Sequence, residues 1–257
     1  MLFRRIIFCA LFVGLLSGLL FSGFQYFSVS PIIFQAEAFE LSEPVSEPVV
    51  DDHHHGQSAG AAHSHDTEAW APEDGTERTL YSILSNVLAG IGFAAVVLAL
   101  MSQLQLQGIT KLSPLKGLLW GTAGFIAFFA APGIGLPPEI PGIEAAPIEN
   151  RQSWWTFTVI ASGLGLAVLA FAKGYFKVLG LVLMALPFII GAPHVVGPEF
   201  AHPDAAAVST LVELHQQFII ASGISNLIFW LAIGGLSAWA LNRKILVNDL
   251  DGGHAPV

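Results

Sequence analysis

Residues Leu80–Met101 read LYSILSNVLAGIGFAAVVLALM and contain no charged side chain. A run of this length is what the roughly 30 Å hydrocarbon core of a bilayer requires, since a helix rises about 1.5 Å per residue. Charged residues are rare in such runs because each costs roughly 2.5–3.5 kcal/mol at the bilayer centre. The stretch therefore predicts a transmembrane helix.

The same pattern recurs along the chain. Hydrophobic residues make up 54% of the 257 positions, charged residues make up 11%, and the mean hydropathy is +0.66. These values are typical of membrane proteins. We expect an all-α, polytopic membrane helix bundle with about six transmembrane helices, at Ile6–Phe27, Leu80–Met101, Leu115–Ala131, Trp154–Ala172, Val178–Val196 and Phe218–Leu241.

The basic residues predict the orientation, because loops rich in lysine and arginine stay in the cytoplasm. On a six-helix reading, only Arg78 and Arg151 fall on the external side. We therefore expect a multi-pass protein of the bacterial inner membrane with both termini cytoplasmic. The basic residues on the cytoplasmic side are Arg4, Arg5, Lys111, Lys116, Lys173, Lys177, Arg243 and Lys244.

Four parts follow from this topology: a first transmembrane helix (1–28), an external acidic, histidine-rich loop (29–79), a five-helix transmembrane bundle (80–242) and a cytoplasmic tail (243–257). The loop is rich in proline, serine, glycine and acidic residues, so we expect it to be disordered. The alternative for the first helix is a cleaved signal peptide. Its apolar run exceeds the usual 7–15 residues or so of a signal, and Gly14, Gly18 and Ser22 give it a small-residue face for helix packing.

A histidine-rich tract inside that loop is the strongest local signal for chemistry. Five histidines and three aspartates fall within residues 51–66: Asp51, Asp52, His53, His54, His55, His63, His65 and Asp66. Imidazole and carboxylate donors together suit borderline divalent ions such as Co²⁺, Ni²⁺ or Zn²⁺. The alternative is a solvated polar linker. We interpret the tract as a metal-binding segment without selectivity, because affinity at such a site follows the Irving–Williams order.

A second group of candidate ligands lies at the external ends of the predicted helices. His194 comes 17 residues after Lys177, or roughly 25 Å along a helix, which predicts a position at the outer rim. His215 enters the last helix from the same side, so both could meet Glu139 and Glu213 at one mouth. The alternative is that each histidine is an ordinary interfacial residue. The full group is Glu139, Glu144, Glu149, His194, Glu199, His202, Asp204, Glu213 and His215.

Several functions lack their sequence signature. There is no phosphate-binding loop of the G-x-x-x-x-G-K-[ST] type, no H-E-x-x-H and no G-x-S-x-G, so we expect no enzyme activity and no cofactor. The single cysteine, Cys9, allows no disulfide framework within one chain. Eleven of the 19 acidic residues lie between Glu37 and Glu77, which favours cations rather than nucleic acid as partners. Asn86 and Asn226 lie inside predicted helices, where interhelical hydrogen bonds are their expected role.

The sequence resembles the CbtA family, the predicted cobalt transporter subunits. The resembling segments are Phe3-Arg4-Arg5, NVLAGIGF at Asn86–Phe93, GLLWGTAGFIAFFAA at Gly117–Ala131, GLPPEIPG at Gly135–Gly142, RQSWW at Arg151–Trp155, LPFIIGAPH at Leu186–His194 and NLIFW at Asn226–Trp230. The resemblance implies cobalt import across the inner membrane, often with a small histidine-rich companion, CbtB. It also implies Glu139 and His194 as the best candidates for metal contact.

These observations give one hypothesis and two alternatives. The hypothesis is a cobalt or nickel uptake permease subunit, in a lipid bilayer, with a CbtB-like companion or a second copy of itself. The tract captures the ion, and His194, Glu139, Glu213 and His215 receive it at the mouth. The first alternative is a haem-binding or electron-transfer subunit with His194 and His215 as axial ligands. The second is a metal-binding accessory protein that does not transport.

Overall fold

The computed structural model describes residues 2–40, 72–111 and 113–245. In these residues the regular elements are helical, apart from one isolated β-bridge. The helices are α1 (Leu2–Phe24), η1 (Gln25–Val29), α2 (Ser30–Glu40), α3 (Thr76–Leu106), α4 (Pro114–Phe125), η2 (Ile126–Ala130), α5 (Ala131–Gly135), α6 (Ile148–Phe171), η3 (Gly174–Phe176), α7 (Lys177–Ile190), α8 (Ala205–Ala240) and η4 (Leu241–Ile245).

Five helical runs in the described residues are long and apolar enough to cross a membrane, and α7 is a shorter apolar helix. At 14 residues α7 is roughly 21 Å long, less than the roughly 30 Å hydrocarbon core. It ends at Ile190 rather than at the predicted Val196, because Gly191 adopts φ +88° and Pro193 follows. The predicted membrane fold of about six helices is confirmed. The five long runs are Phe3–Phe39, Thr76–Leu106, Pro114–Gly135, Ile148–Phe171 and Ala205–Arg243.

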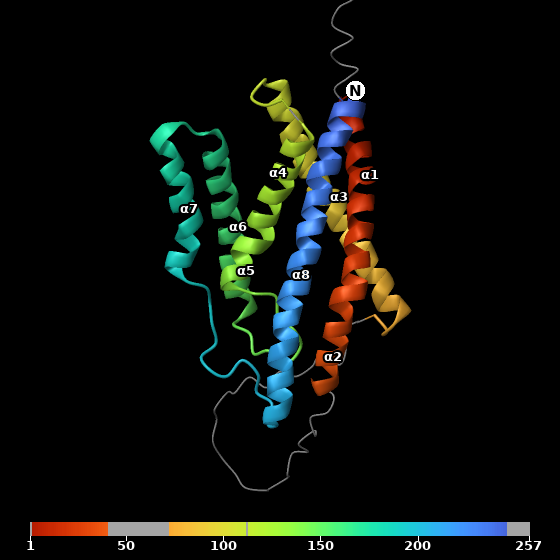
Figure 1. Ribbon diagram of the computed structural model, residues 1–257, viewed down its shortest axis with the longest axis vertical. Coiled ribbons are helices and arrows are strands. Elements are labelled where there is room, and N and C mark those ends of the chain that lie inside the picture. The colour runs from red at the N-terminus through yellow and green to blue at the C-terminus, as the bar shows by residue number, and fades with distance from the viewer. Residues whose placement is uncertain (1, 41–71, 112, 246–257) are drawn as a thin grey trace, which may run out of the picture.

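The helices alternate in direction (Figure 1), so the basic and the acidic residues of the loops fall at opposite ends of the bundle. One end, which we call the basic end, holds the start of α1 and the residues around Lys116 and Lys177. The opposite, acidic end holds the end of α2, the 136–147 loop and the start of α8. Arg78 and Arg151 are the arginines described at the acidic end. This is the arrangement that the charge pattern predicts.

Glycines bring two helix pairs into close backbone contact. A Cβ placed on Gly18 of α1 would lie 2.6 Å from the Val87 Cα of α3, and one on Gly90 of α3 would lie 2.6 Å from the Gly14 carbonyl oxygen. Gly117 and Gly234 join α4 to α8 in the same way. The small-residue face predicted for the first helix therefore packs directly against α3, as such faces do in membranes.

An aromatic layer fills the middle of this bundle. Phe93 of α3 lies 4.8 Å from Trp230 of α8 between ring centroids, and Trp230 stacks at 5.2 Å on Phe128 of η2. Phe229 adds a T-shaped contact with Phe93 at 6.3 Å. The layer belongs to the main buried core, so α3, η2 and α8 are closely packed at mid-height.

The helices α6 and α7 form a hairpin on one side of the bundle (Figure 1). Their contact is close, since a Cβ on Gly180 would lie 2.7 Å from the Gly165 carbonyl oxygen. The Trp154 indole Nε1 also donates a hydrogen bond to the Pro187 carbonyl at 3.3 Å. The hairpin meets the rest of the bundle mainly through η2 and α5.

A second, smaller core lies at the acidic end. Val29, Ile32 and Ala36 share one face of the η1–α2 helix and pack in a cluster with Leu211, Leu214 and Phe218 of α8. Both sets are spaced at i, i+3 and i+7, which places them on one helical stripe. Helix α2 therefore runs to Glu40, inside the segment predicted to be loop from residue 29, and α8 begins at Ala205, ahead of the predicted Phe218.

Candidate functional site

Two segments at the acidic end make up the candidate site. The first is the 136–147 loop between α5 and α6, and the second is the 191–204 segment between α7 and α8. An antiparallel bridge joins Ile143 to Phe200, and the Glu144 amide donates to the Glu199 carbonyl at 3.3 Å. Phe200 is 3% exposed and belongs to the second core. The two segments are thus held together across the acidic end of the bundle.

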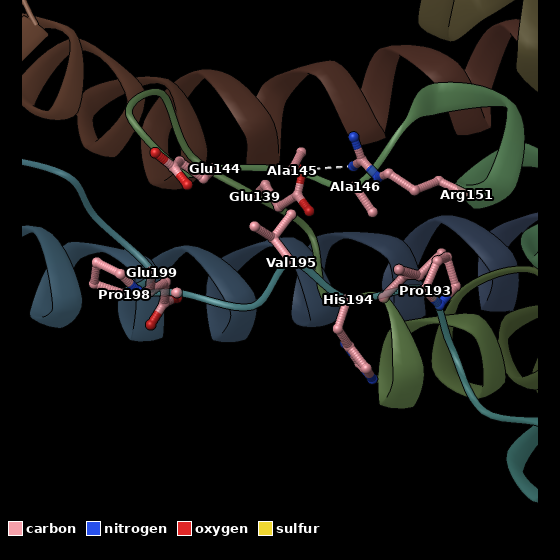
Figure 2. Close-up of a pocket in the computed structure, with 12 residues that line it drawn as sticks. Glu139, Glu144, Ala145, Ala146, Arg151, Pro193, His194, Val195, Pro198 and Glu199 are labelled. Carbon is pink, nitrogen blue, oxygen red and sulfur yellow. Dashed lines mark hydrogen bonds and ion pairs between the residues drawn. The ribbon is translucent and has the colours of Figure 1, made fainter. Parts of the chain in front are cut away.

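A cavity of about 210 Å³ opens between these segments (Figure 2). Its lining brings Glu139, Glu144 and Glu199 together with His194, four of the predicted site residues. Carboxylate and imidazole donors in one cavity form a ligand set that suits Co²⁺, Ni²⁺ or Zn²⁺. The other lining residues are Leu136, Ala145, Ala146, Arg151, Pro193, Val195, Gly197 and Pro198.

Glu139 is paired with an arginine inside this cavity. The Arg151 guanidinium Nη2 donates to the Glu139 Oε2 at 2.5 Å, and the two side chains are 30% and 23% exposed. Arg151 lies in the first turn of α6, and its Nε is buried without a hydrogen-bond acceptor. The pair therefore uses one nitrogen of the guanidinium and one oxygen of the carboxylate.

His194 lines the cavity from its edge. Its side chain is exposed and points away from the Glu139–Arg151 pair (Figure 2). In the described part of the chain, no three histidine, cysteine, aspartate or glutamate side chains are grouped closely enough to hold a metal ion. A metal site here therefore requires His194 to turn inward and Glu139 to leave Arg151.

His215 of α8 lies on the helix side of the site and contacts both of its segments. It is 8% exposed, its Nε2 lies 3.0 Å from the Pro138 carbonyl, and its Nδ1 contacts the Glu199 Oε1. The Nε2–H donates to the carbonyl oxygen, so the Pro138–Glu139 backbone is fixed by this ring. Both ring nitrogens have protein partners, an arrangement that leaves neither free for a metal or a haem iron.

The remaining predicted residues are placed outside the cavity or outside the described residues. Glu213 is exposed and accepts a hydrogen bond from Gln217, and Glu149 is exposed in the first turn of α6. His202 Nδ1 accepts from the Asp204 amide, and the Asp204 carboxylate caps α8. The eight residues of the tract at 51–66 lie outside the described residues.

A second charged cluster at the acidic end went unnoticed in the sequence. Arg78 of α3 donates to both carboxylate oxygens of Glu37 on α2, at 2.6 and 3.0 Å, and to Asp74 at 3.3 Å. Its guanidinium also lies 5.1 Å from the centroid of the Phe34 ring. The Asp74–Arg78 spacing of four residues is a visible signal, but Glu37 was assigned to a loop and could not be paired.

The fold and the site together define a multi-pass helical membrane protein with a carboxylate- and histidine-lined cavity at one end. The chain belongs to the CbtA family: the family model described as a probable cobalt transporter subunit matches residues 3–242. No curated protein sequence and no solved structure matches the chain.

Proposed function

We propose that this chain is the permease subunit of a Co²⁺ uptake system of the bacterial inner membrane, with Ni²⁺ as a second substrate. The acidic end faces outward and receives the ion, and the basic end faces the cytoplasm, as the basic residues favour. One observation carries the proposal. Glu139 and His194, from two segments far apart in the sequence, line one cavity at the end of a bundle whose family is that of cobalt transporter subunits.

In this proposal the ion is handled in two stages. The tract at 51–66 concentrates divalent ions near the cavity without selecting among them, because imidazole and carboxylate donors bind any of these metals. Glu139, His194 and the neighbouring Glu199 then bind the selected ion. His215 keeps these ligands in position through its contacts with Pro138 and Glu199. A small histidine-rich companion of the CbtB type, or a second copy of the chain, completes the transporter.

Uptake of Co²⁺ into cells that lack their own cobalt transport tests this function. Expression of the parent chain is expected to restore accumulation, while Glu139→Gln and His194→Ala raise the Co²⁺ concentration for half-maximal uptake by about tenfold, equal to about 1.4 kcal/mol of binding. Deletion of residues 51–66 is expected to reduce uptake only at low Co²⁺. The control is His202→Ala, at the same end but outside the cavity.

Two results would contradict the proposal. If the parent chain fails to restore accumulation even with a companion protein, the chain is a metal-binding accessory protein rather than a permease. If the cavity variants transport like the parent while His202→Ala does not, the site is misplaced. A Soret absorbance band in the purified protein would instead support the haem-binding alternative.

A further inference from the structure

The arginine inside the candidate cavity calls for an explanation. A single hydrogen bond joins Arg151 to Glu139, and the Arg151 Nε is buried without an acceptor. A guanidinium that matches a carboxylate well uses two parallel N–H groups, as Arg78 does with Glu37. Arg151 is therefore held less well than Arg78, although it lies in a partly buried site.

The charge balance of the cavity fits a doubly charged ion with the arginine still present. The lining carries three carboxylates, Glu139, Glu144 and Glu199, and one guanidinium, Arg151. These four groups sum to −2, and Glu199 in addition contacts the His215 Nδ1, so the lining keeps a negative charge that attracts a divalent cation. Arg151 needs only to release Glu139, and its 30% exposure gives the side chain room to move toward solvent.

We propose that Arg151 is a resident cation that competes with the incoming metal ion for Glu139 and thereby limits how tightly the site holds the ion. This inference rests on the proposed function of the cavity. A hard ion such as Mg²⁺ or Ca²⁺ gains only oxygen ligands there, and the guanidinium already neutralises one of them. Co²⁺ or Ni²⁺ gains the His194 imidazole nitrogen as well, which offsets the lost Arg151–Glu139 pair.

The same competition favours release of the ion. Without Arg151, Glu139 would be free and the cavity would bind a divalent ion more tightly and let it go more slowly, whereas transport requires binding weak enough for the ion to leave. When the ion departs, Arg151 returns to Glu139 and restores the pair. The arginine therefore lowers the affinity by a similar factor for every ion that takes Glu139 as a ligand.

Co²⁺ binding to the full-length purified protein tests the inference. The five tract histidines are replaced by alanine so that titration calorimetry reports the cavity. Arg151→Gln is expected to lower the Kd for Co²⁺ by about tenfold, and the Kd for Mg²⁺ by a similar factor, because neither ion then has to break the pair with Glu139. Arg151→Lys, which keeps the positive charge but not the planar guanidinium, is expected to give an intermediate Kd and covers the case in which the glutamine variant fails to fold.

Arg78→Gln is the matched control, since it removes the same charge from the same end of the bundle at Glu37 and Asp74, outside the cavity. Its Kd is expected to stay within twofold of the parent. If Arg151→Gln and Arg151→Lys bind Co²⁺ as weakly as the parent or more weakly, while Glu139→Gln still weakens binding, the arginine only positions Glu139 and the competition is refuted. If Glu139→Gln has no effect with or without Arg151, both this inference and the proposed cavity function fail.

Discussion

At the scale of single residues, the acidic end depends on one buried histidine. His215 uses both ring nitrogens, on the Pro138 carbonyl and on Glu199. We expect His215→Ala to lower the free energy of unfolding by about 1–3 kcal/mol, because removal of the buried ring leaves the Pro138 carbonyl without its donor and takes away the contact with Glu199. Thermal unfolding of the purified protein measures the change. His202→Ala, which breaks one exposed hydrogen bond, is the control, and equal melting temperatures for the two variants would contradict the role of His215.

The two arginines that depart from the charge rule both take part in ion pairs at the acidic end. Arg78 and Arg151 were set aside as exceptions on the external side, and they are the residues that pair with Glu37 and Glu139. An arginine that departs from the charge rule is a candidate for a local ion pair, and both arginines form one with a glutamate. Sequence reasoning found Glu139 but missed Arg151 as a member of the site.

Polar residues inside the helices were predicted with mixed success. Asn86 makes the expected contacts between helices, donating to Ser22 and Gln25 at 3.1 and 2.7 Å. Asn226 instead donates to the Ser222 carbonyl of its own helix. The residue type is the same and both side chains are half-buried, so the difference lies in what the neighbouring helix presents, which the local sequence does not contain.

At the scale of helices, the contact between α1 and α3 depends on Gly18. We expect Gly18→Val to destabilise the protein by several kcal/mol or to prevent folding, because the added Cβ would meet the Val87 backbone, which cannot move away as a side chain can. Gly23→Val on the same helix is the matched control, since a Cβ there meets nothing within 4 Å. Yield and melting temperature in detergent report the difference. Similar behaviour of both variants would disprove the close contact.

The second core couples the stability of α2 to that of the first turns of α8. Leu211 is 3% exposed in that core, and Leu211→Ala is expected to cost about 2–5 kcal/mol locally, as buried leucine truncations do. The result should be faster amide hydrogen exchange in α2 and in the 136–147 loop. Ile220→Ala, on the same helix at a position that is 62% exposed, should leave this exchange unchanged. Unaltered exchange in the Leu211 variant would show that α2 is stable without α8.

Helix positions were easier to predict than helix ends. The six apolar runs located the five membrane-length helices and the shorter α7 because hydropathy reports burial in lipid. The extensions at Ser30–Glu40 and Ala205–Gln217 are amphipathic and carry Glu37 and Glu213, so a search for uniformly apolar runs stops short of them. Their stripe at i, i+3 and i+7 was present in the sequence and is the signal that identifies them.

At the scale of the whole molecule, the placement of the acidic end outside the cell is a testable prediction. In a Cys9→Ser background, which removes the only native cysteine, Glu73→Cys marks the acidic end and Gln107→Cys marks the basic end. Both positions are exposed. We expect a membrane-impermeant maleimide to label Glu73→Cys on intact spheroplasts and Gln107→Cys only after permeabilisation, because basic loops are retained in the cytoplasm. The reverse labelling pattern would contradict the proposed orientation and, with it, the proposed direction of transport.

The aromatic layer of Phe93, Phe128 and Trp230 also has an electrical consequence. Packed rings exclude water, so an ion could cross the bundle at this level only where the rings part. A divalent ion moved across 100 mV changes in energy by about 4.6 kcal/mol, twice the value of about 2.3 for one elementary charge. On the proposed function, the layer is therefore a barrier that keeps the membrane voltage from driving ions through the bundle, and smaller side chains at these positions are expected to let ions leak.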